Sequence, residues 1–101
     1  MDECTHEKIR EAVASVPQGY VASYGDIADL AGASTPRIVG WVLKEDGFDL
    51  PWHRIVRVDG TPPPHKRQEQ LQLLAGEGIH SDGRKVDMRR YRWEPCGEAE
   101  T

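Results

Sequence analysis

The tetrapeptide Pro51-Trp52-His53-Arg54 is the densest group of side chains in this sequence that could take part in chemistry. His53 beside Arg54 could act as an acid or a base, but catalysis also needs a nucleophile, a metal ion or an electrophile within reach. The neighbouring sequence supplies none of these. Trp52 offers an indole N–H donor and an aromatic face, with no lone pair or thiolate that could attack a carbon. Most tryptophans are core or interface aromatics, and from the residue type alone we expect the same of Trp52. Because no reactive partner is near His53 in the sequence, we assign no catalytic residue.

The sequence also gives no support for a metal ion or a cofactor. Its four histidines lack the spacing of metal ligands, and it contains no Cys-x-x-Cys pair. The segment Gly76-Glu77-Gly78 is too short a signal for a phosphate-binding loop. Cys4 and Cys96 stand near opposite ends of the chain, and we expect two free thiols in a reduced cytoplasm. We therefore expect neither a metal site nor a bound cofactor.

The length of 101 residues predicts one small domain, which we place over residues 1–95, followed by a disordered tail over residues 96–101. The sequence has no apolar run of membrane-spanning length and no secretory signal, so we expect a cytoplasmic protein. The formal net charge is −4. That total gives no general reason to expect a nucleic-acid binder.

The charges are nevertheless unevenly distributed along the chain. Residues 1–36 carry six acidic and two basic side chains, whereas residues 37–67 carry six basic and four acidic ones. Residues 82–93 carry five basic and two acidic side chains. Two interpretations are open: ordinary scatter over a solvated surface, or a modest basic face built from the middle and the end of the chain.

Hydrophobic periodicity predicts a first helix over residues 5–16. Its apolar stripe consists of Ile9, Ala12, Val13 and Val16. After a short extended piece at residues 21–22, Ser23 is an N-cap, with Asp26 three residues on as the acidic form of a capping box. The expected buried face of this next helix consists of Ile27, Leu30 and Ala31. Gly32 ends it.

A further helix follows closely, over residues 35–45. Ser34 or Thr35 caps it, and Pro36 falls in its first turn, where the missing N–H costs nothing. Its apolar side consists of Ile38, Val39, Val42 and Leu43. Two short helices joined by a Gly-containing turn match a helix-turn-helix, although a plain helical hairpin has the same spacing. If the pair reads DNA, residues 35–45 are the recognition helix.

The second half of the chain predicts shorter elements. Alternating side chains over residues 55–58 indicate a strand that ends at the turn of residues 59–60. The three prolines of residues 62–64 form a stiff loop that cannot join a sheet. A last helix is expected over residues 66–75, and a short strand over residues 86–88. The side chains expected to pack inward from the helix and the tail are Leu71, Leu74, Tyr91 and Trp93.

Three segments in one order resemble a known family: residues 21–28 (VASYGDIA), residues 37–40 (RIVG) and residues 50–56 (LPWHRIV). Together they are similar to the C-terminal domain of the O6-alkylguanine-DNA alkyltransferases, over roughly residues 5–95. The family signature is Pro-Cys-His-Arg, in which the cysteine takes the alkyl group from the damaged guanine. Trp52 stands at that cysteine position, as it does in the alkyltransferase-like proteins. The resemblance implies a single α+β domain, mostly helical, whose helix-turn-helix reads the minor groove.

The resemblance also implies roles for individual residues. Tyr24 would press on the phosphate of the target nucleotide and help to rotate it out, while Arg37 would enter the stack and fill the vacated place. The remaining residues that we expect to bind DNA are Ser34 and Thr35. The expected lining of the pocket for the rotated base is Tyr24, Pro51, Trp52, His53, Arg54 and, less directly, Arg67. A planar guanidinium suits the filling role, because it can stack and bond to the orphaned base.

Three departures from the enzyme pattern accompany the resemblance. The nucleophile is absent, and no carboxylate can be matched to the glutamate that orients the enzyme's histidine. Trp52→Cys alone should therefore restore little alkyl transfer. Trp41 occupies a recognition-helix position where the family keeps a small residue, so it must either pack inward or add a stacking surface. The loop of residues 62–64 obscures the alignment of the segment that closes the pocket.

The resemblance implies a non-enzymatic function: recognition of O6-alkylguanine in duplex DNA by nucleotide flipping, followed by recruitment of nucleotide excision repair proteins. We expect a monomer, associated with the nucleoid when bound to DNA, with its acidic residues 1–29 turned away from the DNA. Two alternatives remain open. Cys4 or Cys96 could act as a displaced nucleophile and give residual alkyltransferase activity, or residues 35–45 could read one sequence in the major groove as part of a regulator.

Overall fold

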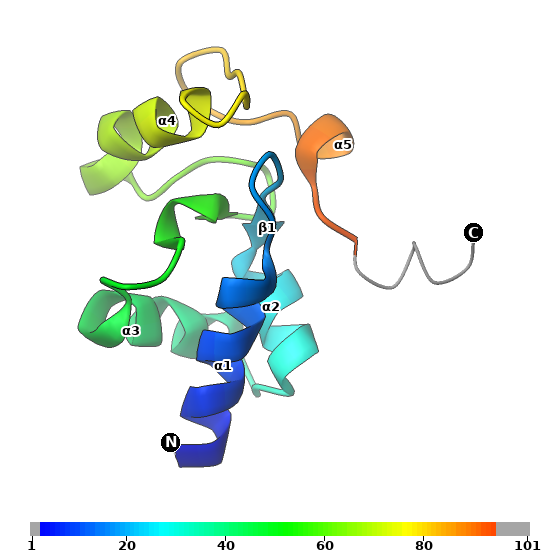
Figure 1. Ribbon diagram of the computed structural model, residues 1–101, viewed down its shortest axis with the longest axis vertical. Coiled ribbons are helices and arrows are strands. Elements are labelled where there is room, and N and C mark those ends of the chain that lie inside the picture. Colours follow the sequence, from blue (N-terminus) through cyan, green and yellow to red (C-terminus); the bar gives the residue numbers. More distant parts are fainter. Residues whose placement is uncertain (1–2, 95–101) are drawn as a thin grey trace.

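The computed structural model describes residues 3–94. Its helices are α1 (Glu3–Ser15), α2 (Tyr24–Ala31), α3 (Pro36–Asp46), α4 (Arg67–Ala75) and α5 (Met88–Tyr91), its strands are β1 (Ala22–Ser23) and β2 (Ile55–Val56), and two 3₁₀ turns are η1 (Trp52–Arg54) and η2 (Pro64–Lys66). Figure 1 shows α1, α2 and α3 together at one end and α4 and α5 at the other. The fold is a small, mostly helical α+β domain. Within the described range, every helix is too short or too polar to cross a membrane.

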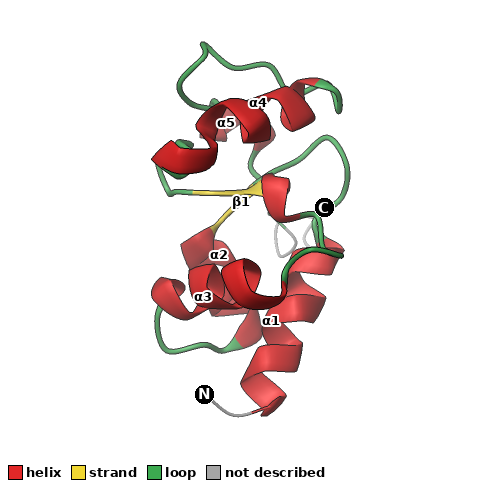
Figure 2. Ribbon diagram, turned by 90° about the vertical axis from the view of Figure 1, so that its left-hand side faces the viewer, coloured by secondary structure: helices red, strands yellow, loops and turns green. Residues whose placement is uncertain are grey.

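The two short strands lie between the two groups of helices (Figure 2). They pair in parallel, with Ala22 opposite Ile55 and Ser23 opposite Val56. Because successive side chains of a strand point to opposite faces, Ile55 is buried in the core of α1, α2 and α3, whereas Val56 is buried in a second core beneath α4. The strand pair thus connects two hydrophobic cores. It is shorter than the predicted strand over residues 55–58, because the chain turns back through a hydrogen bond from the Gly60 N–H to the Arg57 carbonyl.

The predicted helix-turn-helix is present as α2 and α3. The Ser23 hydroxyl accepts the Asp26 N–H at 3.0 Å, and the Asp26 carboxylate accepts the Ser23 N–H at 3.1 Å, which confirms the capping box. Gly32 ends α2 with a left-handed φ of 72°. Thr35 occupies the N-cap position of α3, followed by Pro36, but its side chain makes no capping hydrogen bond. The α2–turn–α3 unit therefore has the boundaries that its sequence signals indicate.

The buried face of α2 differs from the prediction at one position. Ile27, Ala28 and Ala31 are buried, whereas Leu30 is 45% exposed. The face that contacts α1 and α3 is centred on Ile27 and Ala31, so Ala28 falls at one edge of it and Leu30 falls outside. Small alanines let the helices approach closely, and the larger side chain is left on the surface.

The predicted strand over residues 86–88 is wrong. Val86 makes a single bridge to Ser81, and α5 begins at Met88. The Asp87 carboxylate accepts the Arg89 N–H at 3.0 Å, which caps a helix where a strand was expected. The end of α5 and the segment after it pack as expected: Tyr91 and Trp93 lie against the two cores, and the Trp93 N–H donates to the Val21 carbonyl at 2.7 Å. The predicted tail of residues 96–101 lies outside the described residues.

Candidate nucleic-acid interface

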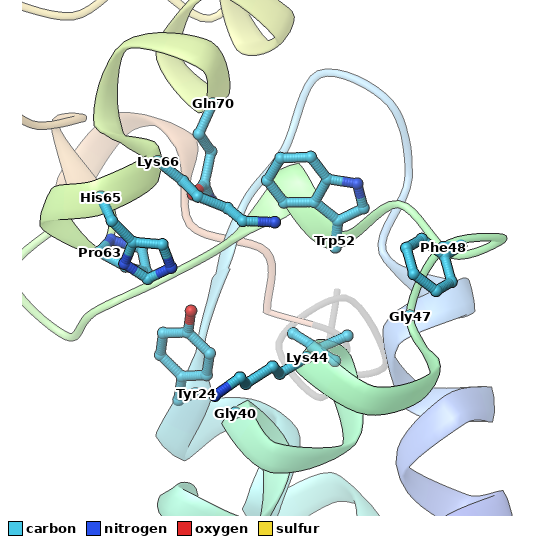
Figure 3. A pocket seen from close by; sticks show the side chains of 11 residues that line it. Tyr24, Gly40, Lys44, Gly47, Phe48, Trp52, Pro63, His65, Lys66 and Gln70 are labelled. Carbon is cyan, nitrogen blue, oxygen red and sulfur yellow. The ribbon is translucent and has the colours of Figure 1, made fainter.

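A cavity of about 290 Å³ lies between α3 and the segment that leads into α4 (Figure 3). It is close to the lower end of the size range of small-molecule pockets. Its wall consists of Tyr24, Gly40, Leu43, Lys44, Gly47, Phe48, Trp52, Pro63, His65, Lys66 and Gln70. Figure 3 shows the Tyr24 hydroxyl directed into this space, below Lys66 and opposite Trp52. The cavity therefore combines aromatic surface with two cationic side chains and a phenol.

Trp52 is placed on the cavity wall by the 3₁₀ turn η1. The Lys66 ammonium lies 4.7 Å from the centre of the indole ring, within the range of a cation–π contact. The His53 ring meets the indole edge-on, with 6.1 Å between ring centres. Within residues 3–94, Lys66 forms no ion pair. The Lys66 ammonium thus lies over the indole without an anionic partner, and a planar ligand that stacks on the same face of Trp52 must displace it.

His53 and Arg54 share one carboxylate, that of Glu77. The His53 Nε2 lies 2.9 Å from a Glu77 oxygen, and Arg54 donates to both oxygens of Glu77 at 2.9 and 2.8 Å. Arg54 also donates to the Val16 carbonyl at 2.9 Å, which fastens the network to the end of α1. Hydrogen bonds from Arg54, with a smaller contribution from His53, lower the pKa of Glu77 to about 2 against the opposing effect of burial.

Glu77 corrects the expectation that no carboxylate orients the histidine. Its distance of 24 residues from His53 hid the contact, because the turn after α4 must fold back before the two side chains meet. The glycines on either side of Glu77 indicated a turn, but no local signal indicated its direction.

Gln70 is a second functional candidate that the sequence analysis missed. It is only 1% exposed, and its amide donates to the carbonyls of His53 and Ile55 at 3.0 and 2.7 Å. These bonds join α4 to η1 and β2, so they hold the backbone that carries Trp52. Gln70 lies one helical turn before Leu74, which was predicted to pack inward, so a polar residue on the inward face of the helix is the signal that could have identified it.

Tyr24 is the first residue of α2, and its half-buried ring lies on the cavity wall. Burial raises the pKa of the Tyr24 phenol, and Arg57 partly offsets this rise. The phenol is therefore neutral at physiological pH and retains its proton for donation to an acceptor such as a phosphate oxygen.

The start of α3 is exposed to solvent. Ser34, Thr35 and Arg37 all lie on this surface, and Arg37 forms no ion pair within the described part of the chain. Trp41, one turn further along α3, is 52% exposed. The indole of Trp41 therefore does not pack inward, which excludes one of the two alternatives and leaves the stacking surface as a prediction. The exposed start of α3 thus offers a cation and an aromatic ring to an external ligand.

The other predicted pocket residues lie behind or beside the cavity. Pro51 precedes η1, and Arg67 begins α4 with its Nε buried and without a hydrogen-bond partner among residues 3–94. His53 and Arg54 are directed to Glu77. Of the six predicted pocket residues, the described cavity wall contains Tyr24 and Trp52. The wall residues that the sequence analysis did not single out as pocket residues include Lys44, Phe48, His65 and Lys66.

A helix-turn-helix is a common DNA-binding element, and an aromatic cavity wall can stack on a rotated base. Residues 5–79 match the family described as 6-O-methylguanine DNA methyltransferase, DNA binding domain, and the chain belongs to this family. It is similar to the DNA base-flipping protein of Escherichia coli (strain K12), with 43% identity over 94 residues that cover 86% of this chain and 72% of that protein.

Two further comparisons cover nearly the whole chain. The alkyltransferase-like protein 1 of Schizosaccharomyces pombe is 34% identical over 107 residues, which cover 94% of this chain and 98% of that protein. The crystal structure of S. pombe Atl1 in complex with damaged DNA containing O6-carboxymethylguanine has a TM-score of 0.82 to this structure. That comparison covers 94% of this chain and 99% of the other, at 29% identity. The predicted fold and family are therefore confirmed.

Proposed function

We propose that this protein recognises O6-alkylguanine in duplex DNA, rotates the alkylated nucleotide into the cavity, and leaves the alkyl group in place. One observation carries the proposal: the Trp52 indole forms a wall of the cavity beside α3. The family resemblance assigns this motif position to the enzymes' cysteine. An indole supplies a surface for stacking but no nucleophile. The residue at this position reacts with the alkyl group in the enzymes, whereas here it would only bind the rotated base.

The residues around the cavity suit nucleotide rotation. Extrusion of a base costs a few kcal/mol of lost stacking and pairing. The neutral Tyr24 phenol can contact the displaced phosphate, and Arg37 at the exposed start of α3 can take the vacated place in the stack. A cation at a helix N-terminus opposes the helix dipole, so a bound DNA partner would relieve an unfavourable placement of Arg37.

The arrangement gives no support to residual alkyl transfer by a displaced cysteine. Cys4 is a free, exposed thiol in the first turn of α1, an element that contributes no residue to the described cavity wall. Cys96 lies outside the described residues. We retain as parts of the proposal the recruitment of nucleotide excision repair proteins, which follows from the family resemblance alone, and the expected monomeric state and cytoplasmic, nucleoid-associated location.

Incubation with a duplex that contains O6-methylguanine tests the absence of chemistry. The protein mass and the amount of lesion should both stay constant, while an adenine analogue beside the lesion that fluoresces when unstacked should brighten. Arg37→Ala should reduce that signal and weaken binding by about 1–3 kcal/mol. A gain of one methyl group in the protein mass would refute the non-enzymatic function, and an unchanged signal in Arg37→Ala would refute the role of Arg37.

A further inference from the structure

The outward face of α3 combines two cations with an aromatic side chain. Arg37, Trp41 and Lys44 follow one another at helical spacings of four and three residues, so they share one face. All three are exposed. Val39 and Val42, on the opposite face, are completely buried. The orientation of α3 is fixed by these valines, and Trp41 is consequently held in solvent.

This face continues into the cavity. Lys44 belongs both to the outward face of α3 and to the cavity wall, and Phe48 follows at the rim with 91% of its surface exposed. Figure 3 shows Phe48 and Lys44 on the α3 side of the cavity. Asp46, near the C-terminal end of α3, is engaged elsewhere: its carboxylate binds His6 at 2.9 Å and Arg10 at 3.3 Å. That carboxylate is therefore paired with α1. Glu45, one turn after Trp41 and next to Lys44, is exposed and forms no ion pair in the described part of the chain, so the outward face carries two cations and borders one carboxylate.

We propose that Trp41 is a second aromatic DNA contact, which packs against the sugars or bases that flank the rotated nucleotide. Lys44, one turn after Trp41, would hold an adjoining phosphate, while Arg37, one turn before it, keeps its proposed place in the stack. Sequence-tolerant DNA surfaces use this combination of aromatic faces and cations, because every nucleotide offers an apolar face and a negative charge. The inference rests on the proposed function, since it places DNA against α3.

The position of Trp41 outside the described cavity wall gives it a different task from Trp52. A rotated base reaches Trp52, and its alkyl group is part of that contact. Trp41 meets only the undamaged nucleotides next to it. Trp41 therefore adds affinity for any duplex, whereas Trp52 adds discrimination between guanine and O6-alkylguanine.

Substitution of Trp41 tests this division. Trp41→Ala should weaken binding to guanine and O6-methylguanine duplexes by the same factor, about tenfold, and Trp41→Phe should retain most of the affinity. Leu30→Ala is the matched control, because Leu30 is similarly exposed on α2 at 45%. It should leave both affinities unchanged. Unchanged binding of Trp41→Ala to both duplexes would overturn the inference, and so would a loss confined to the damaged duplex.

Two further readouts separate an aromatic contact from a charge contact and from loss of fold. Trp41→Ala should leave the dependence of affinity on salt unchanged, whereas Lys44→Ala should reduce that slope by about one. In a Trp52→Phe/Trp93→Phe background, Trp41 is the remaining tryptophan of the chain, and its emission should be quenched by an undamaged duplex. Emission that stays constant at saturating DNA would count against the contact. If the wild-type protein bound neither duplex, the proposed function itself would be refuted.

Discussion

Trp52 and His53 are neighbours in the chain, but their side chains belong to two different regions of the molecule. The Trp52 indole lies on the cavity wall, where it meets the Lys66 ammonium. The His53 ring lies behind it, bonded to Glu77 and adjacent to Arg54 in a network whose His53 and Glu77 side chains are each only 15% exposed. The first region presents a surface to a ligand. In the second, the polar side chains are hydrogen-bonded to one another. Binding and support are thus divided between consecutive residues.

The comparison separates the residue that could bind a ligand from the residues that hold the backbone of η1 in place. Arg54 is joined to Glu77 and to the Val16 carbonyl, and Gln70 is joined to the His53 and Ile55 carbonyls. These bonds fix η1 whether or not a nucleophile is present. We therefore interpret the His53–Glu77–Arg54 network as the frame that holds the Trp52 wall in place.

The largest expected effect comes from the network. Glu77→Gln should lower the free energy of unfolding at neutral pH by up to about 3 kcal/mol, because Arg54 loses its anionic partner. The folded-state pKa of Glu77 is about 2, below the ordinary value of 4.5. Its contribution is thus complete above pH 4.5 and is lost as the pH falls toward 2.

Chemical denaturation of both proteins between pH 2 and 7 measures this contribution. The difference in free energy of unfolding between wild type and Glu77→Gln should shrink as the pH falls. A constant difference over that range would show that Glu77 is not the source of the pH dependence. Glu69→Gln is a suitable control, because Glu69 is an exposed carboxylate of α4.

A smaller effect is expected at the cavity wall. Trp52→Ala should weaken binding to an O6-methylguanine duplex by about 2 kcal/mol, because the stacking surface is removed, with a smaller loss for the guanine duplex. The free energy of unfolding should change little by comparison with Glu77→Gln. Fluorescence anisotropy titrations of both duplexes measure the effect. An equal loss for both duplexes would assign Trp52 to general DNA binding and remove the distinction from Trp41.

The subtlest test introduces a nucleophile. The structure supplies the carboxylate that the sequence left in doubt, so we now expect Trp52→Cys to show slow stoichiometric transfer, in which the thiolate attacks the alkyl carbon and displaces the guanine oxygen. Trp52→Cys/Glu77→Gln should lose most of that activity, because His53 loses its orienting partner. Intact mass after incubation with methylated DNA reports both. Equal transfer by the single and double variants would show that Glu77 does not assist the alkyl transfer.

The sequence predicted the helix-turn-helix because its signals are local. Ser23 with Asp26, Gly32 and Pro36 each act on the backbone within one turn, so their types specify where helices begin and end. The family resemblance then indicated Trp52 as part of the proposed pocket. Neither kind of information required knowledge of which elements pack together.

The remaining features depend on contacts between distant segments. Glu77 meets His53 only after α4 has packed on η1, and Leu30 is exposed because of how α2 meets its neighbours. The segment over residues 86–88 alternates like a strand, but the Asp87 cap directs the chain into α5. The orientation of Trp41 was likewise undetermined until Val39 and Val42 were seen to be buried.

The central claim is that the cavity distinguishes alkylated from unmodified guanine by contact alone. Paired titrations of the wild-type protein against duplexes that differ only in one O6-methyl group test it most directly. The added methyl is worth up to about 0.8 kcal/mol when buried against apolar surface, so we predict binding up to about fourfold tighter for the methylated duplex, with no change in protein mass. Equal affinities for the two duplexes would contradict the account.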